Sequence, residues 1–387
     1  MECLATDELS RLIERVFRPA AGERTLAILI DLPDGLLPDR DSWRVRRALA
    51  ADWVRELIAA REAHGLEVGL FGYRNVRANN ADLPDVAWQI DPENLPATAD
   101  DLDDQRSLPM AAVLASHRLV MAPTELSATA PLKRLAPQLG FRAATMPGFT
   151  AAMVPALRLD YSEVDRRVRL LKGLLDRAEA ADLEFRVDGG RSVDLHLDLR
   201  HRTAHASSGL LHEPGTAGNL PSGEAYIVPY EGERPGDPSR SSGRLPIQLG
   251  DDVAVYRIDA NQAVGVEGDG PAVDAARRTP AAEPATGNLA ELGLGVLAEL
   301  GVRPIGQLLL DEKLGLHLAF GRSDHFGGNV GPSDFSRPEA VIHQDHVFLP
   351  ELQPRVAAAR VELVMPDASR LELMRDGHYM VRFDGGT

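Results

Sequence analysis

Cysteine is almost absent from this chain, since Cys3 is the only one among 387 residues. A single cysteine cannot form an intrachain disulfide, and it cannot supply the several thiolates of a zinc cluster. Any metal ion in this protein must therefore be held by nitrogen and oxygen ligands.

Long apolar runs are also missing, and none approaches the roughly 20 residues that a membrane-spanning helix needs. Residues 1–17 have the pattern of an acidic amphipathic helix, without the basic start and apolar core of a signal peptide. We therefore expect a cytoplasmic protein that has no membrane partner.

Positive charge is in the minority, because 42 Lys and Arg stand against 58 Asp and Glu, which gives a formal net charge of -16. A surface this negative repels the phosphates of nucleic acids and attracts metal cations, so no nucleic-acid partner is expected. Apolar residues make up 44% and charged residues 26%, which is globular composition. The length predicts two domains of ordinary size.

The first half of the chain has the pattern of an α/β domain, which we expect over residues 1–160. Apolar runs typical of buried strands alternate with segments that have apolar residues at helical spacing. Strands are expected at residues 25–33, 66–74, 117–124 and 141–148, and helices at residues 1–17, 41–63 and 131–140. This alternation predicts a mostly parallel sheet. The Asn-, Asp- and Pro-rich residues 75–108 are expected to form a long surface loop.

The second half, residues 161–387, changes to a β-rich pattern. A helix expected at residues 161–181 leads into it. Segments typical of strands then follow, joined by Gly, Pro and Asp turns. One helix is expected near residues 288–300. The prediction is an α+β, β-rich C-terminal domain, and the candidate site residues lie in it.

His343 and Asp345 are two residues apart in a predicted strand. At this spacing both side chains point to one face, so an imidazole and a carboxylate would converge on one point. The alternative is a surface strand with two solvated side chains. His317 interrupts an apolar strand at residues 316–320, where it is either a metal ligand or a core histidine bonded to the backbone.

Two glutamates complete the candidate set. Glu224 follows the turn at residues 219–223, and Glu291 is expected in the first turn of the helix near residue 288. The helix dipole would favour a carboxylate there, so a structural role is the alternative for Glu291, as a solvated or capping role is for Glu224. The set offers three oxygen and two nitrogen ligands, which suit one or two divalent ions of Zn, Mn, Co or Fe.

Four segments of the second half resemble a known family. They are NLPSGEAYIVPYEG, GNLAELGLG, DEKLGLHLAFG followed by FGGN, and HQD. In this order they look like the signature segments of the thermophilic metallo-aminopeptidases (family M29). They are also similar to the wider aminopeptidase-like group that includes the 2,5-dihydroxypyridine 5,6-dioxygenases. Upstream, VMAPTELSATAPLKRLAPQLGFRAATMPG looks like the end of that group's N-terminal domain, so the resemblance covers nearly everything from about residue 115 onward.

The resemblance implies a role for each candidate residue. The aminopeptidase metal ligands fall on Glu224, Glu291, His317, His343 and Asp345. The dioxygenase relatives are similar in holding one iron with the equivalents of His317, His343 and Asp345. A homodimer and a peptide or small-molecule substrate are also implied.

The chain departs from the family pattern at several positions. Gly223 replaces the first of two adjacent glutamates, and a tyrosine expected after His317 is not found. Ala130 and Pro131 stand where the dioxygenases usually have a histidine, and Val296 and Leu297 replace an Asn-Pro pair.

Three functions follow from the motifs and the departures together. The leading prediction is a metal-dependent hydrolase of aminopeptidase-like type, with Glu224 as ligand or general base. The first alternative is a non-heme Fe(II) ring-cleaving dioxygenase. The second is a non-catalytic homologue that acts as a binding or scaffold protein.

Overall fold

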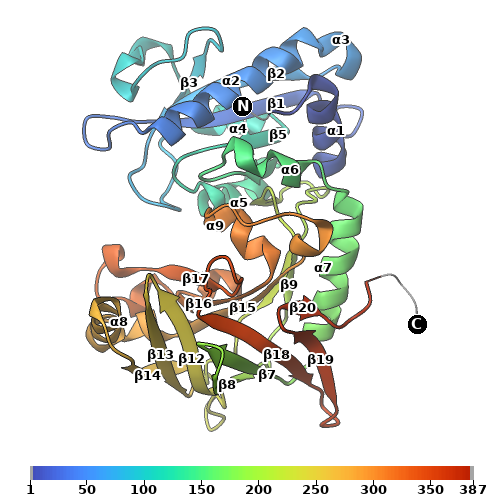
Figure 1. Ribbon diagram of the computed structural model, residues 1–387. Coiled ribbons are helices and arrows are strands. Elements are labelled where there is room, and N and C mark those ends of the chain that lie inside the picture. The colour runs from blue at the N-terminus through green and yellow to red at the C-terminus, as the bar shows by residue number, and fades with distance from the viewer. Residues whose placement is uncertain (1–2, 384–387) are drawn as a thin grey trace. The chain divides into compact units, whose positions relative to one another are not determined.

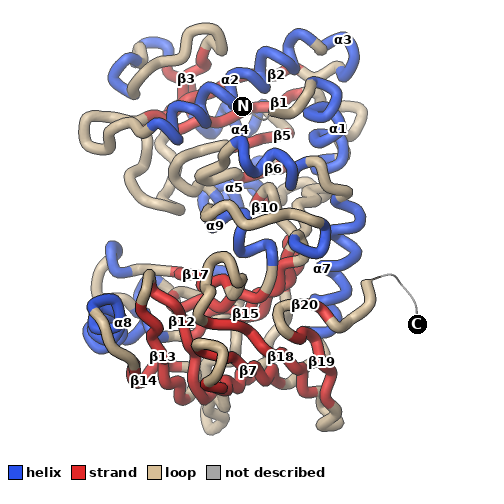
Figure 2. The backbone as a smooth tube through the Cα atoms, viewed as in Figure 1, coloured by secondary structure: helices blue, strands red, loops and turns tan. Residues whose placement is uncertain are grey.

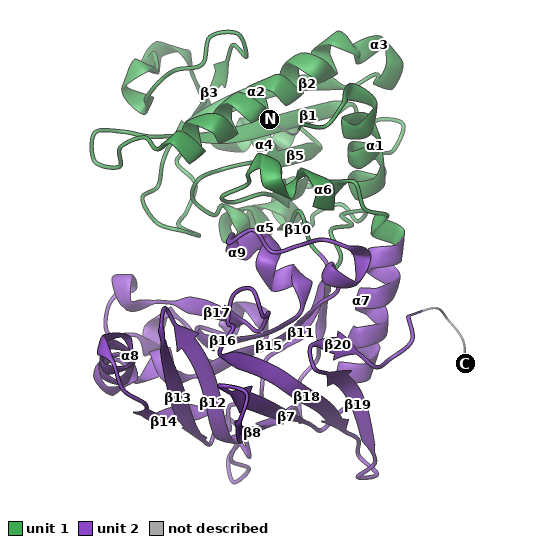
Figure 3. Cartoon of the chain, in the orientation of Figure 1, with its two compact units in different colours: residues 1–162, 207–222 green, residues 163–206, 223–387 purple. Residues whose placement is uncertain are grey.

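The structure, a computed structural model, describes residues 3–383 and divides into two compact units (Figure 3). Unit 1 comprises residues 1–162 and 207–222, and unit 2 comprises residues 163–206 and 223–387. Residues 207–222 belong to unit 1, although the expected division after residue 160 assigned them to the second half. Within residues 3–383, no helix is both long enough and apolar enough to cross a membrane.

Unit 1 contains one mixed sheet with the strand order β10-β6-β5-β1-β2-β3-β4. Five strands run parallel: β1 (Thr25–Leu32), β2 (Glu67–Arg74), β5 (Leu119–Ala122), β6 (Arg142–Thr145) and β10 (Ala217–Asn219). β3 (Val86–Ile90) runs in the opposite direction and pairs antiparallel with β2 and with β4 (Ser107–Pro109). The α/β prediction is confirmed for this sheet, but the long loop expected at residues 75–108 is wrong, because β3 and β4 extend the sheet there.

The helices of unit 1 connect and cover these strands (Figure 1). They are α1 (Thr6–Phe17), α2 (Asp41–Ala59), α3 (Arg61–His64), α4 (Met110–Ser116), α5 (Thr129–Leu139) and α6 (Val154–Leu157). In β1 every residue after Thr25 is buried, as expected of a central parallel strand that is covered on both faces. The apolar run at residues 25–32 is therefore the centre of the unit 1 core.

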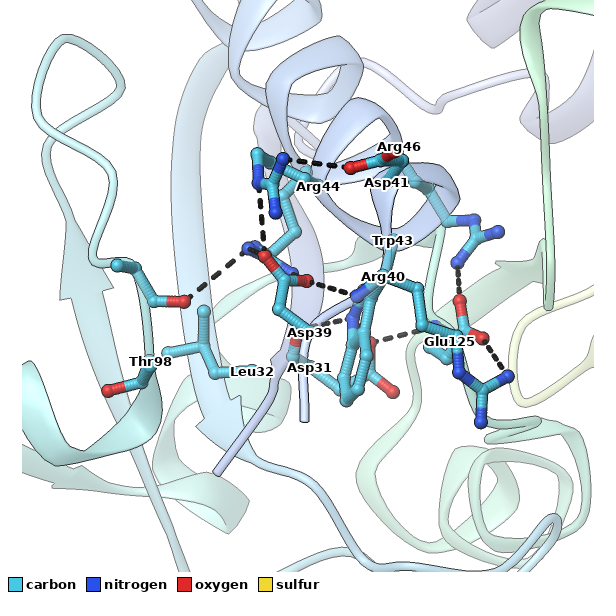
Figure 4. A network of polar contacts seen from close by, with 12 residues as sticks. Asp31, Leu32, Asp39, Arg40, Asp41, Trp43, Arg44, Arg46, Thr98 and Glu125 are labelled. Atoms are coloured by element: carbon cyan, nitrogen blue, oxygen red, sulfur yellow. Dashed lines mark hydrogen bonds and ion pairs between the residues drawn. The ribbon is translucent and has the colours of Figure 1, made fainter. Parts of the chain in front are cut away.

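A buried polar network joins β1, α2 and the loop after β5 (Figure 4). The carboxylate of Asp31, which is 1% exposed, accepts hydrogen bonds from Trp43 Nε1 at 3.0 Å and from the backbone N–H groups of Glu125 at 2.7 Å and Leu126 at 2.9 Å. Arg46 pairs with Glu125 and donates to the carbonyl of Phe149 at 2.7 Å. Burial raises the pKa of Asp31 to about 6, although these donors oppose the shift.

Unit 2 consists mainly of strands, as Figure 2 shows in red. Its larger sheet is antiparallel, with the order β14-β13-β12-β8-β7-β18-β19-β20. These strands are β7 (Ala180–Val187), β8 (Arg191–Asp198), β12 (Ser242–Leu249), β13 (Asp252–Asp259), β14 (Gln262–Glu267), β18 (Val356–Val364), β19 (Arg370–Arg375) and β20 (His378–Tyr379). The helices are α7 (Tyr161–Leu175), which enters from unit 1, α8 (Pro271–Ala282) and α9 (Leu308–Asp311).

The smaller sheet of unit 2 has the order β17-β16-β15-β11-β9. Its strands are β9 (His205–Ser207), β11 (Glu224–Ile227), β15 (Leu289–Gly295), β16 (Leu316–Gly321) and β17 (His343–Val347). The helix expected near residues 288–300 is therefore wrong, because residues 289–295 form β15 between β11 and β16. The alternation in Glu-Leu-Gly-Leu-Gly has the period of a strand, and its two glycines disfavour a helix.

We expect Asp31→Asn to lower the free energy of unfolding by about 1–3 kcal/mol at pH 7.5. The amide NH2 would face one of the N–H donors that now bind the carboxylate, so a buried donor would lose its partner. Urea unfolding measures the loss. The matched control is Asp41→Asn, whose side chain is 96% exposed and whose effect should stay within about 0.5 kcal/mol. Equal stability of the two variants would contradict a structural role for the network.

The loss in free energy of unfolding caused by Asp31→Asn should also depend on pH. The folded-state pKa of about 6 lies above the ordinary aspartate pKa of 3.8, which applies to the unfolded chain, so the folded protein holds this proton more tightly. The stabilisation from that proton is complete below about pH 4 and is lost as the pH rises through 6. Asparagine does not titrate, so the stability difference between wild type and variant should narrow by up to about 3 kcal/mol between pH 4 and pH 7. A constant difference across this range would contradict the shifted pKa.

Candidate metal centre

The smaller sheet of unit 2 places all five predicted residues on one face. Residues that pair across antiparallel strands point to the same side, as do residues two apart within a strand. Glu291 and Asp345 each pair with Ala319, and His317 pairs with Gly293. His343 pairs with Gly321, and Glu224 pairs with Gly295. The register of four neighbouring strands therefore brings together residues that lie far apart in the sequence.

The side chains of these residues converge on Glu291. Its Oε1 lies 3.3 Å from Nε2 of His317, and its Oε2 lies 3.2 Å from Nε2 of His343. His317 Nε2 is also 3.5 Å from Oε2 of Glu224, and His343 Nε2 is 3.6 Å from Oδ1 of Asp345. The five residues thus form one continuous cluster, and their role as metal ligands stays a prediction.

Glycines make room for the cluster. A Cβ atom on Gly293 would lie 1.9 Å from Nε2 of His317, so no side chain fits opposite this imidazole. A Cβ on Gly295 would lie 2.2 Å from the backbone carbon of Lys313. The Gly-Leu-Gly pattern of β15 therefore lets His317 and the segment before β16 approach the strand closely.

Burial and mutual contact shift the ionisation of the cluster. Burial opposes the ionised form of Glu291, but the hydrogen bonds and charges of His317 and His343 hold the pKa of Glu291 well below its usual range. Burial likewise lowers the pKa of His317, and the Glu291 and Glu224 carboxylates outweigh it and raise that pKa to about 9. A buried group of carboxylates that stabilises positive charge in this way favours a bound cation.

The donor atoms fit a divalent metal ion. Nδ1 of His343 lies 2.8 Å from the carbonyl of Arg322, and Nδ1 of His317 lies 3.3 Å from the carbonyl of Gly315. A carbonyl can only accept, so each Nδ1 carries a hydrogen, and in the neutral ring that a metal ion requires the lone pair of Nε2 would point into the cluster. Within residues 3–383, His343 Nε2 and Glu224 Oε2 are buried and have no hydrogen-bond partner. These two unpaired acceptors match the nitrogen and oxygen ligands expected from the sequence.

Sequence reasoning missed two charged residues of the site, Glu312 and Lys313. Lys313 is 2% exposed, its Nζ lies 2.5 Å from Oε1 of Glu224, and it also pairs with Glu312. Burial lowers the pKa of Lys313, but both carboxylates outweigh it and keep the lysine charged. Burial raises the pKa of Glu312, against the effect of Lys313. The feature of the sequence that could have identified them is a Glu-Lys pair directly before a buried apolar strand.

Aromatic rings lie beside the cluster. The rings of His325 and Phe326 each lie 5.3 Å from that of His343. The ring of Tyr226 lies 4.8 Å from that of Phe326 and stacks on His205 at 5.1 Å. Burial raises the pKa of Tyr226, and so do the carboxylates of Glu291 and Glu224. A tyrosine thus reaches the site from β11, two residues after Glu224, although none follows His317.

Two departures from the family pattern pack against each other. A Cβ on Gly223 would lie 2.4 Å from Cδ2 of Leu297 and 3.1 Å from Cγ1 of Val164. Leu297 therefore fills the space beside Gly223, and a glutamate there would require this leucine to move.

Comparison with known proteins shows that this chain resembles solved structures in its fold. No family model and no curated protein matches this chain. Among solved structures, it is similar to the 2,5-dihydroxypyridine dioxygenase of Pseudomonas putida KT2440, with a TM-score of 0.61 and 14% identity over 98% of this chain and 99% of that one. It is also similar to AmpT from Thermus thermophilus, an aminopeptidase, with a TM-score of 0.56 and 16% identity over 98% of this chain and 100% of that one. The resemblance predicted from the motifs is thereby confirmed at the level of the fold, which this chain shares with these two enzymes over nearly its whole length.

Proposed function

We propose that this protein is a metal-dependent hydrolase of aminopeptidase-like type that acts on a peptide, an amide or a related small molecule. One observation carries the proposal: Glu291 belongs to two groups of possible ligands, one with Glu224 and His317 and one with His343 and Asp345. Within each group the ligand atoms lie within 4.8 Å of one another. A carboxylate shared by two such groups could serve an ion in either of them, and metal sites of this kind support aminopeptidase chemistry.

In this proposal the ion is held by Glu291, His343 and Asp345, with His317 on the other oxygen of Glu291. A divalent ion of Zn, Mn, Co or Fe would supply Lewis-acid chemistry, since it polarises a substrate carbonyl and lowers the pKa of bound water. The protein itself fixes the ligands, because β15, β16 and β17 are paired along their length.

Glu224 is the residue that we propose as general base. Its Oε1 is fixed by Lys313 at 2.5 Å, and its buried Oε2 lies 3.5 Å from Nε2 of His317 and accepts no hydrogen bond among the described residues. Burial raises the pKa of Glu224, with Lys313 opposing the shift. A carboxylate with a raised pKa accepts a proton from water more readily near neutral pH. Oε2 of Glu224 would take that proton and later return it to the leaving group.

Asp345→Asn tests the metal ligand set. The change keeps the shape of the side chain but removes one negative charge, so we expect metal affinity to fall by at least about 10–100-fold. The fold should remain near native, because the change is isosteric. Isothermal titration calorimetry with Zn²⁺ measures the affinity, and circular dichroism checks the fold. Asp367→Asn, in an exposed turn, is the matched control. If Asp345→Asn binds Zn²⁺ as tightly as wild type, Asp345 is a solvated residue of the strand, and the non-catalytic alternative is favoured.

Glu224→Gln tests the general base. We expect metal binding to persist, while kcat for hydrolysis of aminoacyl p-nitroanilides or amides falls by about 10²–10⁴-fold, because the amide cannot accept the proton. Glu299→Gln, at an exposed position, should leave kcat unchanged. A Glu224→Gln enzyme with wild-type kcat would remove Glu224 from the reaction.

A second candidate function is an Fe(II) ring-cleaving dioxygenase. It is favoured by the structural likeness to a 2,5-dihydroxypyridine dioxygenase and by the presence of His317, His343 and Asp345. Anaerobic loading with Fe(II), followed by an oxygen-uptake assay with 2,5-dihydroxypyridine, separates the two proposals. If the Glu224→Gln variant still consumes oxygen in this assay, the result supports the dioxygenase. Failure of the purified protein to bind any divalent ion supports a non-catalytic homologue.

A further inference from the structure

Lys313 is held in place beside the candidate metal centre. It lies in the 3-10 turn Glu312–Leu314, directly before β16. Its carbonyl accepts a hydrogen bond from the backbone N–H of Leu297 at 2.9 Å, and its backbone packs closely against Gly295. The side chain is 2% exposed. The ammonium therefore cannot swing out to solvent without disrupting the segment that precedes β16.

The ammonium neutralises one side of the cluster only. It lies 2.5 Å from Oε1 of Glu224 and also pairs with Glu312. Glu224 belongs to the ligand group that it forms with Glu291 and His317. A divalent ion in this group would sit beside a fixed positive charge in a site with little water, where like charges repel strongly.

The other ligand group has no such neighbour. Among residues 3–383, Glu291 and Asp345 have ion-pair contacts with histidines alone, and neither has a lysine or arginine partner. Nε2 of His343 lies between these two carboxylates, 3.2 Å from Oε2 of Glu291 and 3.6 Å from Oδ1 of Asp345, and makes no hydrogen bond within residues 3–383. The Glu291, His343 and Asp345 group therefore keeps both the negative charge and the free nitrogen that a divalent ion needs.

We infer that Lys313 is a built-in cation that takes the place of a second metal ion, so that the cluster binds one divalent ion at Glu291, His343 and Asp345. The inference rests on the proposed function, because it assumes that the cluster binds metal. It also explains how Glu224 is left for proton transfer, since Lys313 holds one of its oxygens and the other stays unligated. Lys313 acts through Glu224 and is a positioning residue.

Metal stoichiometry tests this inference directly. Wild-type protein, stripped with chelator and titrated with Zn²⁺ in a calorimeter, should bind one ion per chain with high affinity. Lys313→Met removes the charge at similar volume, and we expect it to bind a second ion. Lys313→Arg keeps the charge and should bind one. With Co²⁺ in place of Zn²⁺, electron paramagnetic resonance should show an isolated ion in wild type and a coupled pair, bridged by Glu291, in Lys313→Met.

The possible outcomes separate the inference from the proposed function. Wild type that binds no ion ends the proposed function, and the inference with it. Wild type that binds two ions tightly leaves the proposed function standing and overturns the role of Lys313. A folded Lys313→Met that still binds a single ion also overturns it. If Lys313→Met does not fold, Lys313→Gln answers the same question, because the amide keeps a donor to Glu224 without the charge.

Discussion

The burial of several carboxylates on one face of a small sheet is the constraint on which this site depends. Glu224, Glu291 and Asp345 lie on that face, and Glu312 lies in the turn before β16, where their burial keeps water from neutralising them. Buried charge is unfavourable unless it is paired, so the sheet must bring positive groups to the same face. Lys313, which pairs with Glu224, and the two histidines, which both pair with Glu291, meet this need. The arrangement of the cluster is thus set by charge compensation as much as by strand geometry.

Much of this fold could be predicted from local pattern, because its strands bury apolar runs that have clear boundaries. The apolar run at residues 25–33 predicts a buried strand, and the spacing of His343 and Asp345 predicts side chains on one face. Each of these patterns spans only a few residues. Glu291 shows the limit of that approach. Its segment was expected to be a helix, but residues 289–295 pair with β11 on one side and β16 on the other. The local alternation indicates a strand there, but the pairing partners are distant in sequence, and the local pattern does not identify them.

The five candidate ligands could be found from the sequence because each lies in a motif of the resembled family. Glu312 and Lys313 lie in one of the same motifs, yet their part in the site depends on a contact with Glu224, which is 89 residues earlier in the sequence. A Glu-Lys pair in a sequence is usually exposed to solvent. Only the structure shows that this lysine is buried, at 2% exposure, and that its Nζ is directed to Oε1 of Glu224. The electrostatics of the site therefore could not be derived before the strands were placed.

The same fold can serve different chemistry according to the groups that surround the site. The dioxygenase and the aminopeptidase that share this fold show that the scaffold alone does not select a reaction. In this chain the groups that surround the candidate ligands include Gly223, which is packed against Leu297, a tyrosine from β11 and the ammonium of Lys313. None of these groups removes a candidate ligand. Each alters the space or the charge beside one, and a fixed ammonium alters it most, because one positive charge at 2.5 Å from a carboxylate oxygen decides whether that oxygen can also serve a metal ion.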